Sequence, residues 1–233
     1  MRVRKKKNID RRLLAASEYI VPTGEYRPGH WLPEGFSRLE VELGCGKGRF
    51  ITETALKNPD VFYIAIEREK HVMVMAAERA HGLGLSNILF MDEDAARLSE
   101  IFAEGEVWNI YINFCDPWPT GRHAKRRLTH RRQLVVCRLV LRPEGRIFLR
   151  TDQEPLFDFS AEEFGECGFN VVFSTRDLHR ERPPEIMTEY EERFFLQGLP
   201  IYALEAAMGP LPDGFRVEKK RRNPDPVLED ETQ

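Results

Sequence analysis

The chain has 233 residues, of which 42% are hydrophobic and 31% are charged, and its formal net charge is −3. This composition excludes a wholly disordered or collagen-like chain, and the length suffices for one large domain with a substantial core. No run approaches the roughly 20 apolar residues of a membrane helix, and the basic N-terminus lacks the apolar stretch of a secretory signal, so no membrane is expected.

The spacing of apolar residues predicts strands that alternate with helices. Seven strands are expected, at 38–43, 61–66, 87–91, 107–113, 146–150, 169–174 and 200–206. Helices are expected at 49–56, 70–81, 95–102, 129–141 and 154–165, with Thr129 as a candidate N-cap and a turn at 142–145. This alternation predicts an α/β, doubly wound, Rossmann-like fold with a seven-stranded, mostly parallel sheet, whose ligands bind beyond the carboxyl ends of the strands.

No internal repeat or domain break interrupts this alternation. We expect a flexible basic N-terminal extension (1–20), a single domain (21–208) and a disordered C-terminal tail (209–233). The four cysteines, which include no Cys-x-x-Cys pair, predict reduced thiols in the cytoplasm and no metal site.

A glycine-rich turn follows the first strand, as Glu42-Leu-Gly44-Cys-Gly46-Lys-Gly48. Glycines allow a sharp turn and close approach by a ligand. The spacing is G-x-G-x-G, so the dinucleotide fingerprint G-x-G-x-x-G is not met. An acid two residues before the first glycine is typical of S-adenosylmethionine sites, which makes Glu42 and the three glycines candidate cofactor residues. The alternative is a turn that only joins strand to helix.

Acids at the ends of the next two strands are further candidates. Glu67 closes the second strand, where doubly wound sheets place an acid that accepts hydrogen bonds from ribose hydroxyls; Glu69 is the competing assignment. By the same logic Asp94, after the third strand, would face the adenine, with Asp92 as a close rival. Alone, such acids are more often exposed surface residues, but the glycine turn upstream favours a functional role.

The fourth strand runs into Asp116-Pro117-Trp118-Pro119. Each proline disfavours helix in the residue before it, so Asp116 and Trp118 are expected to be extended. A carboxylate and an indole held together can hydrogen-bond and stack on a flat heterocycle, and stacking is worth roughly 1–3 kcal/mol per base. The alternative, a purely structural turn, is disfavoured by the run of cations that follows, in which Arg122, Lys125, Arg126 and Arg127 offer phosphate contacts.

The cations are segregated along the chain. Residues 1–12, 122–132 and 216–222 hold 18 of the 35 lysines and arginines, which leaves 17 cations against 36 acids elsewhere. Because a polyanion responds to local patches, the near-neutral total does not exclude a nucleic-acid partner. For the two terminal segments, solvated tails are the alternative.

These residues resemble the bacterial tRNA (guanine-N7-)-methyltransferase family of the TrmB type, from about Arg38 to Glu205. The most specific mark is Asp-Pro-Trp-Pro-x-x-Arg-His-x-Lys-Arg-Arg at 116–127, and Thr151-Asp152 and Thr188-Glu189-Tyr190-Glu191 also match. The resemblance implies a class I methyltransferase fold that uses S-adenosyl-L-methionine to form 7-methylguanosine at position 46 of the tRNA variable loop. It further implies a cytoplasmic monomer or homodimer.

The resemblance also implies roles for individual residues. Glu42, Glu67, Asp94 and Asp116 would lie at the cofactor with Gly44, Gly46 and Gly48, and Asp116 would also be catalytic. Substrate contacts would come from Thr120, Asp152, Thr188, Glu189, Tyr190 and Glu191, and RNA contacts from Arg122, His123, Ala124, Lys125, Arg126 and Arg127. Thr120 stands where the family often has a lysine, so it can donate a hydrogen bond but supplies no charge.

The chemistry of the substrate agrees with this interpretation. Guanine N7 has an in-plane lone pair and no proton at neutral pH, so in-line attack on a sulfonium methyl requires no strong general base. Alignment and favourable fields would supply the rate enhancement, and we expect Asp116 to orient the guanine, helped by Asp152. A nicotinamide or flavin oxidoreductase is disfavoured by the glycine spacing. A non-catalytic RNA-binding protein is disfavoured by the complete set of acids.

Overall fold

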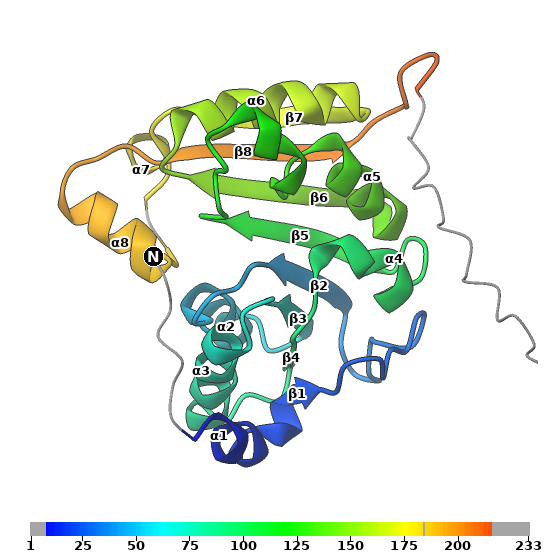
Figure 1. Cartoon of the computed structure of the whole chain (residues 1–233), viewed down its shortest axis with the longest axis vertical. Helices are drawn as coiled ribbons and strands as arrows, with labels where there is room; N and C mark the ends of the chain where they lie inside the picture. The colour runs from blue at the N-terminus through cyan, green and yellow to red at the C-terminus, as the bar shows by residue number, and fades with distance from the viewer. Residues whose placement is uncertain (1–7, 184, 216–233) are drawn as a thin grey trace, which may run out of the picture.

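A mixed sheet forms the centre of the molecule (Figure 1). The structure, a computed structural model, describes residues 8–183 and 185–215. Over these residues eight strands follow the order β1-β4-β3-β2-β5-β6-β8-β7. All neighbours from β1 to β6 pair in parallel, and β8 runs antiparallel between β6 and β7. The predicted Rossmann-like, mostly parallel sheet is therefore confirmed.

The strands are β1 (Ile20–Val21), β2 (Arg38–Leu43), β3 (Val61–Ile66), β4 (Ile88–Met91), β5 (Val107–Asn113), β6 (Leu141–Thr151), β7 (Phe169–Thr175) and β8 (Tyr202–Met208). The prediction of seven strands was wrong by one, because β1 adds an edge strand. In β1, Ile20 pairs with Phe90 and Val21 with Met91. Two residues carry no alternation pattern, so this strand exists only through its backbone pairing with β4.

Helices cover both faces of the sheet. The helices are α1 (Ile9–Ala15), α2 (Arg49–Lys57), α3 (Lys70–Gly82), α4 (Leu98–Ile101), α5 (Arg131–Val140), α6 (Glu154–Glu166), α7 (Leu178–Glu181) and α8 (Glu189–Leu196). The 3-10 turns are η1 (Ser17–Tyr19), η2 (Ala95–Arg97) and η3 (Gly121–Arg126), and the faces themselves are covered by α2 and α3 on one side and by α4, α5 and α6 on the other. Along β3, Phe62 and Ile64 join the core under α4, α5 and α6, whereas Tyr63 and Ala65 join the core under α2 and α3. A strand buried on both faces needs a continuous apolar run, and β3 has one.

The turn expected at 142–145 was wrong. Strand β6 begins at Leu141, directly after α5 ends, and its register with β5 slips between the pairs Val107–Leu141 and Asn109–Arg146. The segment that contains Pro143 and Gly145 is thus an irregular stretch within the sheet, where a Cβ on Gly145 would lie 2.3 Å from the Trp108 carbonyl oxygen. Proline and glycine mark the interruption of the ladder, but not the end of the strand.

The candidate cap at Thr129 was also wrong. The N-cap of α5 is His130, whose Nδ1 accepts a hydrogen bond from the backbone N–H of Arg132 at 3.1 Å. Thr129 is instead fully buried, and its hydroxyl accepts a hydrogen bond from Ser160 of α6 at 2.7 Å. Because α5 begins at Arg131, Thr129 lies one residue too early in the chain to be its N-cap.

The structure describes part of the segment before the first predicted strand and little of the segment after the last one. Residues 8–20 of the expected N-terminal extension include α1 and η1, which lie beside α3 through an Arg12–Glu78 ion pair and a 2.8 Å contact between Glu18 and His81. Residues 1–7 and 216–233, with most of the two terminal basic segments, lie outside the described residues. No helix of the described chain is long and apolar enough to cross a membrane.

Candidate active site

The carboxyl ends of the parallel strands bring most of the predicted site residues to one edge of the sheet. Strand β2 lies between β3 and β5, so the chain order reverses there and the loops after β2 and β5 diverge to opposite faces. Such a switch point is where open α/β sheets bind ligands. In Figure 1, α8 lies beyond this same edge, next to the ends of β5 and β6.

The glycine turn after β2 has a backbone that only glycine adopts easily. Gly44, Gly46 and Gly48 all have positive φ, at 75°, 57° and 79°. Gly48 also lies against α3, where an added Cβ would come within 2.5 Å of the Ala76 Cβ. The turn is therefore required for α2 and α3 to pack closely, in addition to any role with a ligand.

Glu67 holds this turn in place. Its carboxylate accepts hydrogen bonds from the backbone N–H groups of Gly46 at 3.0 Å and Glu69 at 2.9 Å. Burial raises the pKa of Glu67, and the two backbone hydrogen bonds oppose that rise. The side chain of Glu69 is exposed at the start of α3. Of the two rival acids, Glu67 is the one that contacts the glycine turn.

Glu42 and Asn113 form a buried polar pair at the ends of β2 and β5. Glu42 is 1% exposed and Asn113 is 6% exposed, and the Asn113 amide donates to Glu42 Oε1 at 2.9 Å. Glu42 Oε2 and Asn113 Oδ1 have no hydrogen-bond partner. Burial raises the pKa of Glu42 to about 7, against the lowering effects of Asn113 and Arg150. Two buried acceptors without a donor fit a ligand that brings N–H groups or positive charge.

Asn113 is not among the residues predicted from the sequence to form the site. The signal that could have identified it is its place as the last residue of β5, beside the glycine turn across the switch point.

Asp92 and Asp94, after β4, remain rival candidates. Asp94 is more than half exposed; it accepts a hydrogen bond from the Ala96 N–H at 2.8 Å and lies 4.0 Å from Arg68. Asp92 is half-buried, and burial raises its pKa. The adjacent Glu93 is buried and bonds Tyr26 and Arg97.

The Asp-Pro-Trp-Pro loop, residues 114–120, carries two strained positions. Phe114 and Trp118 have φ values of 51° and 42°, so the prediction of an extended Trp118 was wrong. The Arg126 guanidinium lies over the Trp118 indole at 4.8 Å, and His123 meets it edge-on at 5.8 Å. Asp116, between the strained residues, is exposed. The loop therefore presents a carboxylate and an indole together at the sheet edge.

The basic run forms η3 immediately after this loop. Arg122, Lys125 and Arg126 are exposed there, and the Thr120 hydroxyl lies 3.1 Å from His123 Nδ1. Ala124 is half-buried within the same turn. The exposed cations of η3 thus begin beside the Trp118 indole, which Arg126 contacts.

The Thr188–Glu191 segment starts α8 with a capping box. Thr188 Oγ1 accepts from the Glu191 N–H at 3.0 Å, and the Glu191 side chain accepts in return from the Thr188 N–H. Glu191 is fully buried, 3.1 Å from Arg150 and 3.2 Å from His179. Because Glu191 faces the interior, its direct neighbours are protein groups.

Helix α8 contacts both loops of the candidate site. Glu189 pairs with Lys47 of the glycine turn at 2.8 Å, and the Tyr190 ring stacks on Phe114 at 6.4 Å. Asp152, which follows β6, is half-buried and accepts a hydrogen bond from Gln153. The structure therefore gathers the residues predicted from three distant sequence segments.

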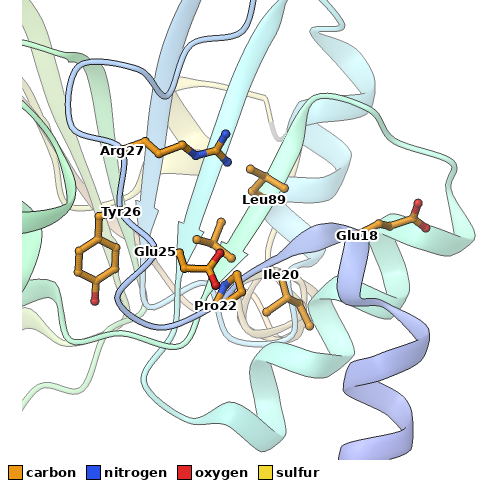
Figure 2. Close-up of a pocket in the computed structure, with 8 residues that line it drawn as sticks. Glu18, Ile20, Pro22, Glu25, Tyr26, Arg27 and Leu89 are labelled. Carbon is orange, nitrogen blue, oxygen red and sulfur yellow. The ribbon is translucent and has the colours of Figure 1, made fainter.

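Two hollows are lined by other residues. One, of about 520 Å³, is lined by residues of the N-terminal segment and by Leu89, around the short strand β1; Figure 2 shows Glu25 and Arg27 on its walls. The other, of about 650 Å³, lies between α6 and the end of β7. Neither is lined by a residue predicted from the sequence to belong to a site.

Comparison with known proteins defines the class. A family model described as "Putative methyltransferase" matches residues 37–204. Together with the sheet order and the acid-lined glycine turn, this match defines the protein as a methyltransferase with a Rossmann-like fold.

A tRNA (guanine-N(7)-)-methyltransferase of Lactococcus lactis subsp. cremoris (strain MG1363) is 40% identical over 216 residues, covering 90% of this chain and 99% of the relative. One from Brevibacillus brevis is 41% identical over 208 residues, covering 86% and 97%. The chain belongs to the tRNA (guanine-N7-)-methyltransferase family.

Solved structures agree on the fold. The 16S rRNA methyltransferase KamB superimposes with a TM-score of 0.58 at 17% identity, over 76% of this chain and 90% of its own. A SAM-dependent methyltransferase from Aquifex aeolicus gives 0.53 at 14% identity, over 73% and 82%.

Proposed function

We propose that this protein transfers a methyl group from S-adenosyl-L-methionine to N7 of a guanine in tRNA, at position 46 of the variable loop. The observation that carries the proposal is the Asp-Pro-Trp-Pro loop, which joins the buried Glu42–Asn113 pair at its beginning to the exposed cations of η3 at its end. An acidic cofactor side and a cationic RNA side thus meet at Asp116 and Trp118. Because tRNA is the substrate, the cytoplasm is the expected location.

The acidic side fits this cofactor. Glu42 Oε2 and Asn113 Oδ1 are buried acceptors that lack a donor, and the cofactor carries both an ammonium group and a positive sulfur. The glycine turn permits close approach by the cofactor, and Glu67 holds the turn by accepting a hydrogen bond from the Gly46 N–H. Asp92 or Asp94 would take the adenine side. Over the described residues no group of three His, Cys, Asp or Glu could hold a metal ion.

The reaction needs positioning rather than proton transfer. When bound, the cofactor supplies a methyl group activated by a sulfonium. N7 of the guanine would take that methyl group as its bond to sulfur breaks, which would leave the base cationic. The protein therefore has to orient N7 and present negative potential. Asp116 is exposed beside the Trp118 indole and is suited to both tasks, with Asp152 adding charge from the end of β6.

The cationic side fits a phosphate backbone. Arg122, Lys125 and Arg126 are exposed on η3, and His123 and Ala124 lie among them. Thr120, Thr188, Glu189 and Tyr190 would approach the substrate from the loop and from α8. Glu191, which is buried, would act by holding Thr188 at the start of that helix.

Asp116→Asn is expected to lower kcat by about 10²- to 10³-fold, the scale for removing one preorganised electrostatic contact, and to leave the dissociation constant of tRNA within about twofold. Rapid-quench methyl transfer and filter binding measure the two quantities. Full turnover in the variant would contradict the role of Asp116.

The substrate is tested by incubating the protein with bulk tRNA and methyl-labelled cofactor, followed by nucleoside analysis. Labelled 7-methylguanosine, mapped to the variable loop, is the expected product. Label on another nucleoside would refute the substrate, and tight binding of a dinucleotide without binding of S-adenosylhomocysteine would favour an oxidoreductase.

A further inference from the structure

We propose that Arg127 is a positioning residue that clamps the Asp-Pro-Trp-Pro loop, and that it does not neutralise an RNA phosphate. The proposal rests on the function proposed above and separates Arg127 from the neighbouring cations, with which the sequence motif groups it. Its Nε donates to the Pro117 carbonyl at 2.9 Å and its Nη2 to the Trp118 carbonyl at 3.0 Å.

Arg127 also contacts α6 and the end of η3. The guanidinium of Arg127 lies over the Phe159 ring of α6 at 4.3 Å, and its backbone N–H bonds the Ala124 carbonyl at 3.0 Å, where η3 ends. The side chain is half-buried between the loop and α6. Arg126, by contrast, is exposed, and the contact described for its side chain is with the Trp118 ring.

The clamp acts where the backbone is strained. A non-glycine residue at positive φ is strained, and this backbone persists only when its surroundings hold it. Trp118 has a φ of 42°, and its carbonyl is one of the two that Arg127 binds. The planar fork of donors in arginine holds two successive carbonyls in a fixed geometry, which the single ammonium of lysine on its flexible stem does not do. We infer that the fork keeps Asp116 and Trp118 in their reactive arrangement.

Four variants test this clamp, namely Arg127→Ala, Arg127→Lys, Arg126→Ala and, as matched control, Arg138→Ala. Arg138 also bonds two backbone carbonyls, of Gly168 at 2.7 Å and of Gly209, and lies over a phenylalanine ring, but at the opposite edge of the sheet. For each variant, kcat, KM for tRNA and the salt dependence of tRNA affinity are measured.

Both Arg127 variants should lose kcat by about 100-fold, the scale for a misplaced reacting group, with an unchanged slope of log affinity against log salt. Arg126→Ala should flatten that slope by about 0.7–0.9, as expected for one lost phosphate contact. Arg138→Ala should keep wild-type kcat and slope. Three results would overturn the proposal. The first is wild-type activity in Arg127→Lys, and the second is a slope change in Arg127→Ala equal to that in Arg126→Ala. The third is a loss of kcat in Arg138→Ala as large as in the Arg127 variants.

Hydrogen–deuterium exchange of residues 114–120 adds a readout that needs no substrate. Exchange should rise in this loop in both Arg127 variants and stay at the wild-type rate in Arg138→Ala; unchanged protection in the Arg127 variants would refute the clamp. A wild-type protein that fails to methylate tRNA would refute the proposed function, whereas the exchange measurement would still decide the clamp.

Discussion

Glu42 is a charge whose burial opposes folding when no ligand is present. The carboxyl is 1% exposed, and one of its oxygens has no hydrogen-bond donor. Burial raises its pKa from 4.5 to about 7. Since the folded state binds this proton more tightly than the unfolded chain does, the contribution of Glu42 to the free energy of unfolding falls as pH rises from 4.5 to 7. A residue kept at such a cost is expected to serve binding.

Replacing Glu42 by Gln should therefore stabilise the ligand-free protein at pH 8 by roughly 1–3 kcal/mol, since 1.36 kcal/mol accompanies each pKa unit. The stabilisation should nearly vanish at pH 4.5, where Glu42 is protonated in the folded state and already half protonated in the unfolded chain. Urea unfolding at the two pH values measures it. The same substitution should weaken binding of S-adenosylhomocysteine, by calorimetry. A variant less stable than wild type at pH 8 would show that the ionised carboxylate is satisfied in the native fold.

At the scale of elements, the glycine turn couples the packing of two helices to the shape of the candidate cofactor site. Gly48 precedes α2 and touches Ala76 of α3, whereas a Cβ on Gly46 would meet nothing within 4 Å. The two glycines have similar left-handed φ angles. They differ mainly in whether a side chain has room.

Gly48→Ala is accordingly expected to cost roughly 2–5 kcal/mol of stability, from left-handed strain plus overpacking against α3. Gly46→Ala, the matched control, should cost only the strain, roughly 1–2 kcal/mol. Chemical denaturation of both variants gives the comparison. Equal losses would mean that α2 and α3 separate easily and that the close contact is unimportant.

At the scale of the whole molecule, the net charge of −3 does not show where the positive charges lie. Many of the arginines in the described chain bond carboxylates within the fold, as Arg49 does with Glu192 and Arg131 does with Glu163. Arg122 and Lys125 are exposed on η3, beside the candidate active site. Local potential, and not net charge, should decide how a polyanion binds.

The double variant Arg122→Ala/Lys125→Ala should weaken tRNA binding and flatten its salt dependence by about 1.4–1.8 in slope, for two phosphate contacts. The control Lys57→Ala/Arg142→Ala changes the net charge equally, at positions paired with Glu185 and Glu144. It should leave the slope unchanged. Equal effects of both pairs in a salt titration would mean that tRNA responds to the total charge alone.

Local sequence was sufficient to predict most of the fold, and it led to the expectation that ligands bind beyond the carboxyl ends of the strands. Apolar runs such as Val61–Ile66, which is buried on both faces, predicted the strands and their alternation with helices. The glycines at 44, 46 and 48 predicted a sharp turn after the first strand, and all three have positive φ in the structure. These features depend on neighbours within a few residues, and they therefore remain visible in the linear sequence.

Only the tertiary structure decided how those residues are used. The pairing of β1 with β4, the buried partner Asn113 of Glu42 and the burial of Glu191 against Arg150 all join segments far apart in the chain. Arg127 shows the limit most directly. Its motif places it among the phosphate-binding cations, yet its guanidinium lies between Phe159 and two loop carbonyls. The distribution of charge over the surface is likewise decided by the tertiary structure. Composition determines its sum, whereas folding pairs or exposes each charge, because ion pairs form across space and not along the sequence.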